Sequence, residues 1–266
     1  MFSHDGKGTL EELCISAVNN RLSGFAVTDH CDCEISDNEA MLENLQNSYL
    51  EAEKYQNLYM DRLIISKGIE IGESLFNPSF AEKIIAERDY DVILGSVHAV
   101  RIKDHDIPFS LIDFSCFDNE FIESYVTQYF IDLLETANTA DYDILSHLTV
   151  VLRYIVYKYN RKVELKRYFP VIKEILKTVI SRGKTLEVNT SGIENGYFMP
   201  DEEIISMYKE LGGKRISLGS DSHFPESIGA GLTEGALLLS KLGFTELTYY
   251  INRIPYEYKT QGLLQR

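Results

Sequence analysis

The sequence has little of what marks several large classes of protein. It contains no tryptophan, and its four cysteines among 266 residues are too few and too irregularly spaced for a disulfide framework. No apolar run reaches the roughly 18 residues that a membrane-spanning helix needs. The first residues, MFSHDGKG, lack the hydrophobic stretch of a signal peptide. We therefore expect a cytoplasmic protein that does not associate with membranes.

Basic residues are also scarce. Lysine and arginine number 26 against 41 aspartates and glutamates, which gives a net charge of −15. Such an acidic balance argues against nucleic acid as a partner. Glycine-rich phosphate loops of the dinucleotide or Walker type are absent as well. The hydrophobic content of 44% is that of an ordinary folded protein, and the composition leaves the oligomeric state open.

The hydrophobic pattern repeats one unit, a short β-branched run followed by a polar turn and an amphipathic helix. Thr9 and Glu12 have the spacing of a capping box that opens the first helix. Strands alternating with helices favour a parallel sheet, either closed as a barrel or open, and the missing glycine-rich loops favour the barrel. We expect one domain over residues 1–266. The predicted strands are 25–28, 63–69, 91–97, 142–146, 185–188 and 215–219, and 247–258 is predicted to be extended.

Side chains that can bind metals follow most of these strands. In a parallel barrel the carboxyl ends of the strands meet on one face, so such residues would surround one pocket. Any one histidine alone would more often be a hydrogen-bonded core or rim residue, but the set together indicates a site. Imidazoles and carboxylates without thiolates suit zinc, iron or manganese, and their number exceeds the needs of one ion. The residues are His30, Glu70, His98, His147, Asp221 and His223.

Six short motifs resemble those of the polymerase and histidinol phosphatase (PHP) superfamily, in the same order over nearly the whole chain. Within it, LEVNTSG, KELGG and the HL that precedes Arg153 are most similar to the histidinol-phosphate phosphatase branch. The motifs are TDH (28–30), GIEIG (68–72), GSVH (95–98), SHL (146–148), LEVNTSGI (186–193) and GSDSH (219–223).

This resemblance implies a distorted TIM-like (β/α)7 barrel that holds two to three divalent ions, zinc, iron or manganese. It also implies how the ligands are shared among them. One ion would lie on Glu70, His98 and His147, a second on Asp5 or His4 with His30 and His223, and a third on Asp221, Glu70 and two histidines of an N-terminal D-x-H-x-H motif.

The D-x-H-x-H motif does not occur in this sequence. Ser3 to Gly6 resemble the short segment that directly follows it in the family, so we expect about ten upstream residues to be missing. They would form the first barrel strand, and without it the neighbouring strands would expose unpaired edges and an apolar slot. Two explanations stay open: a start codon assigned too far downstream, which we favour, or a natural variant with one weakened metal position.

The family activity implied is a metal-dependent phosphatase for a small phosphomonoester, most simply L-histidinol phosphate in histidine biosynthesis. Water would attack phosphorus in line, with Glu70 and Asp221 as catalytic carboxylates beside the metals. Arg153 is a candidate phosphate clamp, because a planar guanidinium matches phosphate oxygens. Asn189 and Arg101 are further substrate-binding candidates. The simpler alternatives are a solvated Arg153, a surface Arg101 and an Asn189 that caps the following turn.

Two other functions remain open at this point. A phosphodiesterase or nuclease of the same superfamily would use the same metals, although the acidic charge counts against it. A non-catalytic protein that binds metal or phosphate is the other, because the first metal motif is missing.

Overall fold

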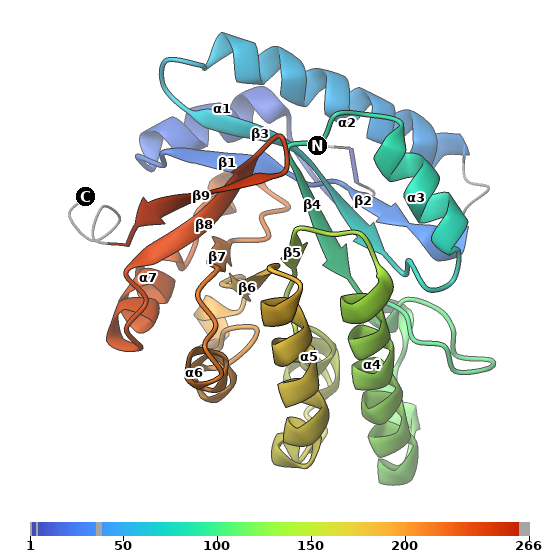
Figure 1. Cartoon of the computed structure of the whole chain (residues 1–266). Helices are drawn as coiled ribbons and strands as arrows, with labels where there is room; N and C mark the ends of the chain where they lie inside the picture. The colour runs from blue at the N-terminus through green and yellow to red at the C-terminus, as the bar shows by residue number, and fades with distance from the viewer. Residues whose placement is uncertain (1, 4, 36–38, 261–266) are drawn as a thin grey trace.

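The computed structural model describes residues 2–3, 5–35 and 39–260, and its centre is a curved parallel sheet. The strands curve into a half-barrel (Figure 1), as expected of a distorted TIM-like barrel. A short strand, β2 (His30–Asp32), also pairs with β3, beyond the end of β1. The strand order is β1 (Gly24–Val27), β3 (Ile64–Gly72), β4 (Val92–Ser96), β5 (Ile144–Leu145), β6 (Thr185–Asn189) and β7 (Ile216–Gly219).

Helices cover the outside of this arc (Figure 1). The predicted capping box is confirmed, because Thr9 accepts from the backbone of Glu12 and the Glu12 carboxylate accepts from that of Thr9. The helices are α1 (Leu10–Asn19), α2 (Glu39–Leu58), α3 (Pro78–Ala86), α4 (Asn119–Thr139), α5 (Phe169–Ser181), α6 (Glu202–Glu210) and α7 (Leu232–Lys241).

The main core lies between the sheet and helices α4 to α6. Tyr125, Tyr129 and Phe130 of α4 are fully buried there, and every residue of β6 is buried. Strands of a parallel sheet that are covered on both faces read as continuous apolar runs. A polar side chain inside such a strand is therefore unusual, and Glu187 in β6 is one.

The end strands of the sheet, β1 and β7, do not pair with each other in the part of the chain that the structure describes. A cavity of about 580 Å³ lies between them, with an apolar wall that includes Val27, Leu218 and Tyr250. The segment predicted as extended is a hairpin, β8 (Glu246–Ile251) with β9 (Ile254–Lys259), and it lies across this open side (Figure 1).

The strand boundaries differ from the prediction by one or two residues at most ends, and two differences bear on the site. β3 runs on to Gly72, so Glu70 lies inside the strand and not after it. The buried Ile71 continues the apolar face of the strand and explains this extension. β2 was not predicted, because three residues of sequence HCD carry no hydrophobic pattern.

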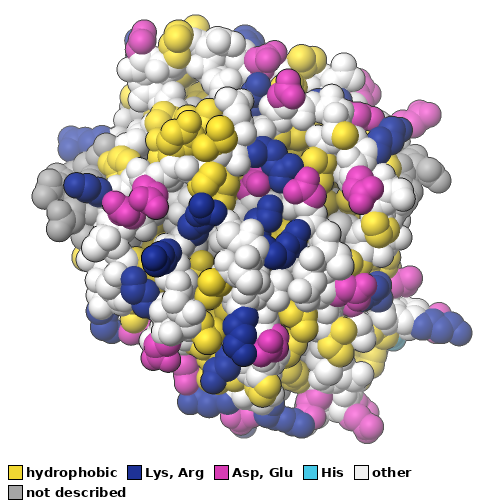
Figure 2. Space-filling model, viewed as in Figure 1, with side chains coloured by type: hydrophobic (Ala, Val, Ile, Leu, Met, Phe, Trp, Pro, Cys, Tyr) yellow, Lys and Arg dark blue, Asp and Glu magenta, His cyan; other side chains and the backbone are white. Residues whose placement is uncertain are grey.

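Among the described residues, none of the helices is long and apolar enough to cross a membrane. On the face shown in Figure 2, lysine and arginine side chains are interspersed with acidic and hydrophobic ones.

Candidate metal and phosphate site

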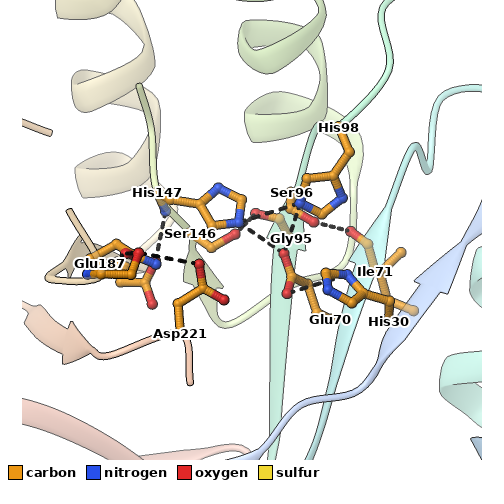
Figure 3. A network of polar contacts seen from close by, with 12 residues as sticks. His30, Glu70, Ile71, Gly95, Ser96, His98, Ser146, His147, Glu187 and Asp221 are labelled. Carbon is orange, nitrogen blue, oxygen red and sulfur yellow. Dashed lines mark hydrogen bonds and ion pairs between the residues drawn. The ribbon is translucent and has the colours of Figure 1, made fainter. Parts of the chain in front are cut away.

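Glu70 lies at the centre of a cluster of imidazoles at the carboxyl end of the sheet (Figure 3). Its Oε1 is 2.9 Å from Nε2 of His147 and 3.2 Å from Nε2 of His98, while Oε2 is 3.6 Å from Nδ1 of His30. The two Nε2 atoms of His98 and His147 are 3.4 Å apart. The register of the sheet produces this cluster, because His30 on β2 stands opposite Glu70 on β3.

The Glu70 side chain is ionised in spite of its position. Only 5% of the residue is exposed. Burial raises the pKa of Glu70, but the neighbouring His30, His147 and His98 outweigh that effect and hold it well below its usual range. Burial likewise opposes the charged form of His147, yet Glu70 raises its pKa overall. Glu70 therefore keeps its negative charge because the imidazoles around it can carry protons or bind cations.

A second group lies next to the first and joins the N-terminal segment to the end of β7. Nε2 of His223 is 3.0 Å from Oδ2 of Asp5, and this contact raises the pKa of His223 to about 9. The ring centroids of His30 and His223 are 6.3 Å apart. Asp29 anchors the segment that carries Asp5, because its Oδ1 accepts the backbone N–H groups of residues 2 and 3 at 2.9 and 2.6 Å.

The donor atoms of these groups fit divalent cations. In each of three sets, one ligand atom per residue lies within 4.8 Å of the others. Two histidine nitrogens and a carboxylate oxygen that converge in this way are typical of zinc and of other first-row metals. Two of the sets are those that the sequence motifs imply. The sets are Glu70, His98 and His147; Asp5, His30 and His223; and His30, Asp32 and His98.

Asp221, which follows β7, joins this cluster to an arginine. Its Oδ2 is 3.6 Å from Nη1 of Arg153, and its Oδ1 is 3.7 Å from Nδ1 of His223. Burial opposes ionisation of Asp221, but the charges of His147 and Arg153 outweigh it and hold the pKa below its ordinary value. A carboxylate and a guanidinium thus stand side by side at the edge of the cluster.

Polar groups that follow β6 extend this edge. Nη2 of Arg153 donates to Oγ of Ser191, whose backbone N–H donates to Oδ1 of Asn189 at 3.1 Å. The amide Nδ2 of Asn189 is buried and has no hydrogen-bond partner among the described residues. Asn189 also lines the cavity. A donor that is buried without a partner is costly.

The backbone is strained at two of these positions. His147 has a φ of 22° and Asp221 a φ of 49°, values that non-glycine residues adopt rarely. Residues held in such conformations cluster at functional sites. In each case the turn directly after a strand directs the side chain back toward the cluster, as Figure 3 shows.

The structure brings most of the predicted residues together and leaves Arg101 apart. His4 lies outside the described residues. The guanidinium of Arg101 is held by α4, where it donates to Oδ1 of Asp132 at 2.7 Å and also to Glu135. The residues that do meet at the site are Asp5, His30, Glu70, His98, His147, Arg153, Asn189, Asp221 and His223.

Sequence reasoning missed three residues of the site. Glu187 is buried in β6, and its Oε2 accepts the backbone N–H of His147 at 2.7 Å (Figure 3). Burial raises the pKa of Glu187 to about 7. An acidic residue inside the apolar run LEVN was the signal that could have found it. Asp32 lies two residues after His30, hence on the same face of β2, and Ser191 sits in the quoted LEVNTSGI motif.

A parallel half-barrel whose strand ends gather imidazoles and carboxylates around a common point defines a class of metal-binding α/β proteins. The PHP domain model matches residues 1–191 of this chain. The chain therefore belongs to the PHP domain family.

Known proteins resemble the chain over most of its length. It is 26% identical to the histidinol-phosphatase of Lactococcus lactis, covering 94% of this chain and 91% of that protein. It is 27% identical to a "probable histidinol-phosphatase" of Clostridium acetobutylicum, covering 86% of both. The crystal structure of the Lactococcus lactis histidinol phosphate phosphatase, complexed with zinc, L-histidinol and phosphate, superposes with a TM-score of 0.80 at 24% identity, covering 96% of this chain and 95% of the other.

Proposed function

We propose that this protein is a metal-dependent phosphatase that hydrolyses L-histidinol phosphate to L-histidinol and phosphate. The observation that carries the proposal is the pair of adjoining ligand sets around Glu70 and His223, with a guanidinium at their edge. The names of the similar proteins and the zinc, histidinol and phosphate bound in one of them support the same activity. We assign the activity to residues 1–266 as one unit, acting in the cytoplasm, where its four free cysteines would stay reduced.

The two ligand sets would each hold one cation, and these cations would supply most of the chemistry. Glu70, His98 and His147 would hold one of them, and Asp5, His30 and His223 the other. When bound, divalent cations neutralise phosphate charge and make a water molecule acidic enough to act as a nucleophile near neutral pH. Zinc is our first choice, because the sets combine imidazole nitrogens with carboxylate oxygens.

The remaining residues would position the substrate and move the proton. Arg153 would hold two phosphate oxygens, since its guanidinium already lies beside the ligand sets. The unpartnered amide of Asn189 would donate to a third oxygen. Asp221, ionised at neutral pH, would accept a proton from the attacking water. Arg101 has no part in this arrangement, because Asp132 and Glu135 hold its guanidinium.

Phosphate release tests the proposal directly. The full chain, loaded with zinc or manganese, should release phosphate from histidinol phosphate, and His147→Ala should abolish release. A bis-aryl phosphate diester serves as the competing substrate. Cleavage of the diester without the monoester would favour the phosphodiesterase alternative. Bound metal with no cleavage of either substrate would favour a non-catalytic binding protein.

A further inference from the structure

Two stacked tyrosines join the segment that carries Arg153 to the loop that follows β6. The rings of Tyr157 and Tyr197 are nearly parallel, with their centroids 3.7 Å apart and 12° between their planes. Tyr157 lies four residues after Arg153, in a single π-helical turn, Arg153–Lys158. Such turns are rare, and they are frequent at functional sites. The stack therefore connects an unusual piece of backbone at the edge of the metal site to the end of a neighbouring strand.

Gly192 provides the surface on which the ring of Tyr197 packs. A Cβ built on Gly192 would lie 2.2 Å from Cε2 and 2.4 Å from Cδ2 of Tyr197, so a side chain there would displace the ring. The φ of Gly192 is −88°, a value that any residue adopts. The contact with the ring therefore requires this glycine, and the backbone conformation does not. Gly192 directly follows Ser191, whose Oγ accepts from Nη2 of Arg153.

The guanidinium of Arg153 depends on these neighbours for its orientation. Nη1 is 3.6 Å from Oδ2 of Asp221, and Nη2 donates to Ser191. Burial lowers the pKa of Arg153, but contacts that include the charge of Asp221 and a hydrogen bond with Tyr197 raise it overall. An arginine side chain has many rotamers, and fixing one of them costs conformational entropy. A displaced Tyr197 would disturb two of the groups that select this rotamer, its own hydroxyl and the turn at Ser191.

Tyr157 contributes to this arrangement through its ring alone. About half of it is exposed, 51%, whereas Tyr197 is 8% exposed. Among the hydrogen bonds of the described residues, none joins the hydroxyl of Tyr157 to Arg153. Removing the Tyr157 ring therefore removes the stack without opening the apolar core and without taking away a direct partner of the guanidinium.

We propose that the Tyr157–Tyr197 stack is a positioning device for Arg153, which fixes the turn at Ser191 against the π-helical turn and so aims the guanidinium at the phosphate of the substrate. This inference rests on the proposed function in taking Arg153 as the phosphate clamp. Neither tyrosine belongs to a ligand set, so the stack acts on phosphate and leaves the cations in place.

The affinity of the full, zinc-loaded chain for inorganic phosphate, measured by calorimetry, tests the role. We expect Tyr157→Leu to weaken phosphate binding about 10-fold, the lower end of the effect of losing a charged hydrogen bond. Tyr157→Phe keeps the ring and should bind as the wild type does. Gly192→Ala should weaken binding as Tyr157→Leu does, because its methyl group displaces the ring of Tyr197.

Tyr256→Leu is the matched control for the loss of an exposed, stacked tyrosine. Tyr256 is 43% exposed, and its ring stacks on that of Tyr249 in the β8–β9 hairpin, with the centroids 5.6 Å apart. This variant should bind phosphate with wild-type affinity. Thermal unfolding and zinc stoichiometry of every variant establish that each one folds and holds its metals.

A double-mutant cycle supplies the readout that a merely structural role would not produce. If the stack acts through Arg153, adding Tyr157→Leu to Arg153→Ala should weaken phosphate binding no further. A general loosening of the site would weaken binding equally in both backgrounds. If Tyr157→Leu does not fold, Gly192→Ala in the same two backgrounds decides.

Four results would overturn the inference. Two are wild-type affinity in Tyr157→Leu and an equal further loss when Tyr157→Leu is added to Arg153→Ala. The third is a Tyr157→Phe variant as weak as Tyr157→Leu, because the hydroxyl and not the stack would then be responsible. The fourth is wild-type phosphate affinity in Arg153→Ala, which would leave the stack no clamp to position.

The inference and the proposed function fail in different ways. A wild-type chain that binds phosphate through Arg153 but releases none from histidinol phosphate would exclude the proposed function alone. An active wild-type chain whose phosphate affinity is indifferent to Tyr157→Leu and Gly192→Ala would exclude the inference alone.

Discussion

The carboxylate of Glu187 holds the backbone of His147, with Oε2 accepting the His147 N–H at 2.7 Å. This bond stabilises a residue whose φ of 22° is unfavourable for any side chain, a strain of about 1–3 kcal/mol. Glu187 can approach only because Gly219 lies beside it on β7, where a Cβ would overlap Oε1 of the carboxylate. The position of His147, a candidate metal ligand, therefore depends on the absence of a side chain at Gly219.

Gly219→Ala is predicted to weaken zinc binding about 10-fold, the lower end of the effect of groups that orient metal ligands. The new methyl group would displace the Glu187 carboxylate and release the turn at His147. A zinc titration of the metal-free protein measures this. Ser217→Ala on the same strand is the control, because that hydroxyl has no hydrogen-bond partner among the described residues. Wild-type affinity in Gly219→Ala would show that Glu187 does not hold His147.

His98→Ala is predicted to lose the zinc on the Glu70 set while the chain keeps its fold, because His98 lies at the rim and outside the apolar core. Zinc at about 100 times its Kd should stabilise the wild type by roughly 2.7 kcal/mol, and the variant much less. Thermal unfolding with and without zinc measures the difference. His105→Ala, whose ring packs against Phe117 and Phe121 in a loop, is the control. Full zinc stoichiometry in His98→Ala would contradict its role as a ligand.

The alternation of strands and helices could be predicted because buried parallel strands are continuous apolar runs bounded by turns. The same pattern predicted a candidate site, since polar residues directly after such runs meet at one edge. Strand ends were less accurate. β3 continues past Glu70 to Gly72, because the alternation of Ile69, Glu70 and Ile71 is equally compatible with a strand that ends or one that continues.

The residues behind the ligands could not be predicted, because their roles depend on register. Nothing in the local sequence says that Asp32 stands opposite Gly72, or that Glu187 stands opposite Ser217 on β7. The pairing of Arg101 with Asp132 and Glu135 could not be predicted either, because these residues of α4 lie 31 and 34 positions away in the sequence. Pairing partners of a parallel sheet are set by tertiary packing, and single positions do not encode them.

Arg253, in the turn of the β8–β9 hairpin, is predicted to stabilise the fold in a way that depends on pH. It donates to Asp141 at 2.6 Å and to Asp143 at 3.0 Å, and its hydrogen bond lowers the pKa of Asp141. A lowered pKa stabilises the folded state above the unfolded value of about 3.9, and that contribution disappears as the pH falls through the folded value.

Arg253→Gln should therefore cost about 2 kcal/mol at neutral pH and progressively less below about pH 4. Urea unfolding at both pH values measures the change. Lys177→Gln, which removes an exposed partner of Glu174 within α5, is the control and should cost less than about 0.5 kcal/mol. An equal loss at both pH values would mean that Arg253 acts through packing instead of charge.

Arg153→Ala is predicted to raise KM for histidinol phosphate by about 10–100-fold, the range expected for losing a charged hydrogen bond of roughly 1.5–3 kcal/mol. The phosphate is bound before and during the reaction, so kcat should change less than KM. Zinc stoichiometry should stay at the wild-type value, because Arg153 contacts Asp221 and Ser191 and belongs to neither proposed ligand set. Arg153→Lys, which keeps the charge but loses the planar pair of donors, should fall between the two. An unchanged KM in Arg153→Ala would exclude the clamp, and a loss of zinc would mean that Arg153 supports the metal site through Asp221.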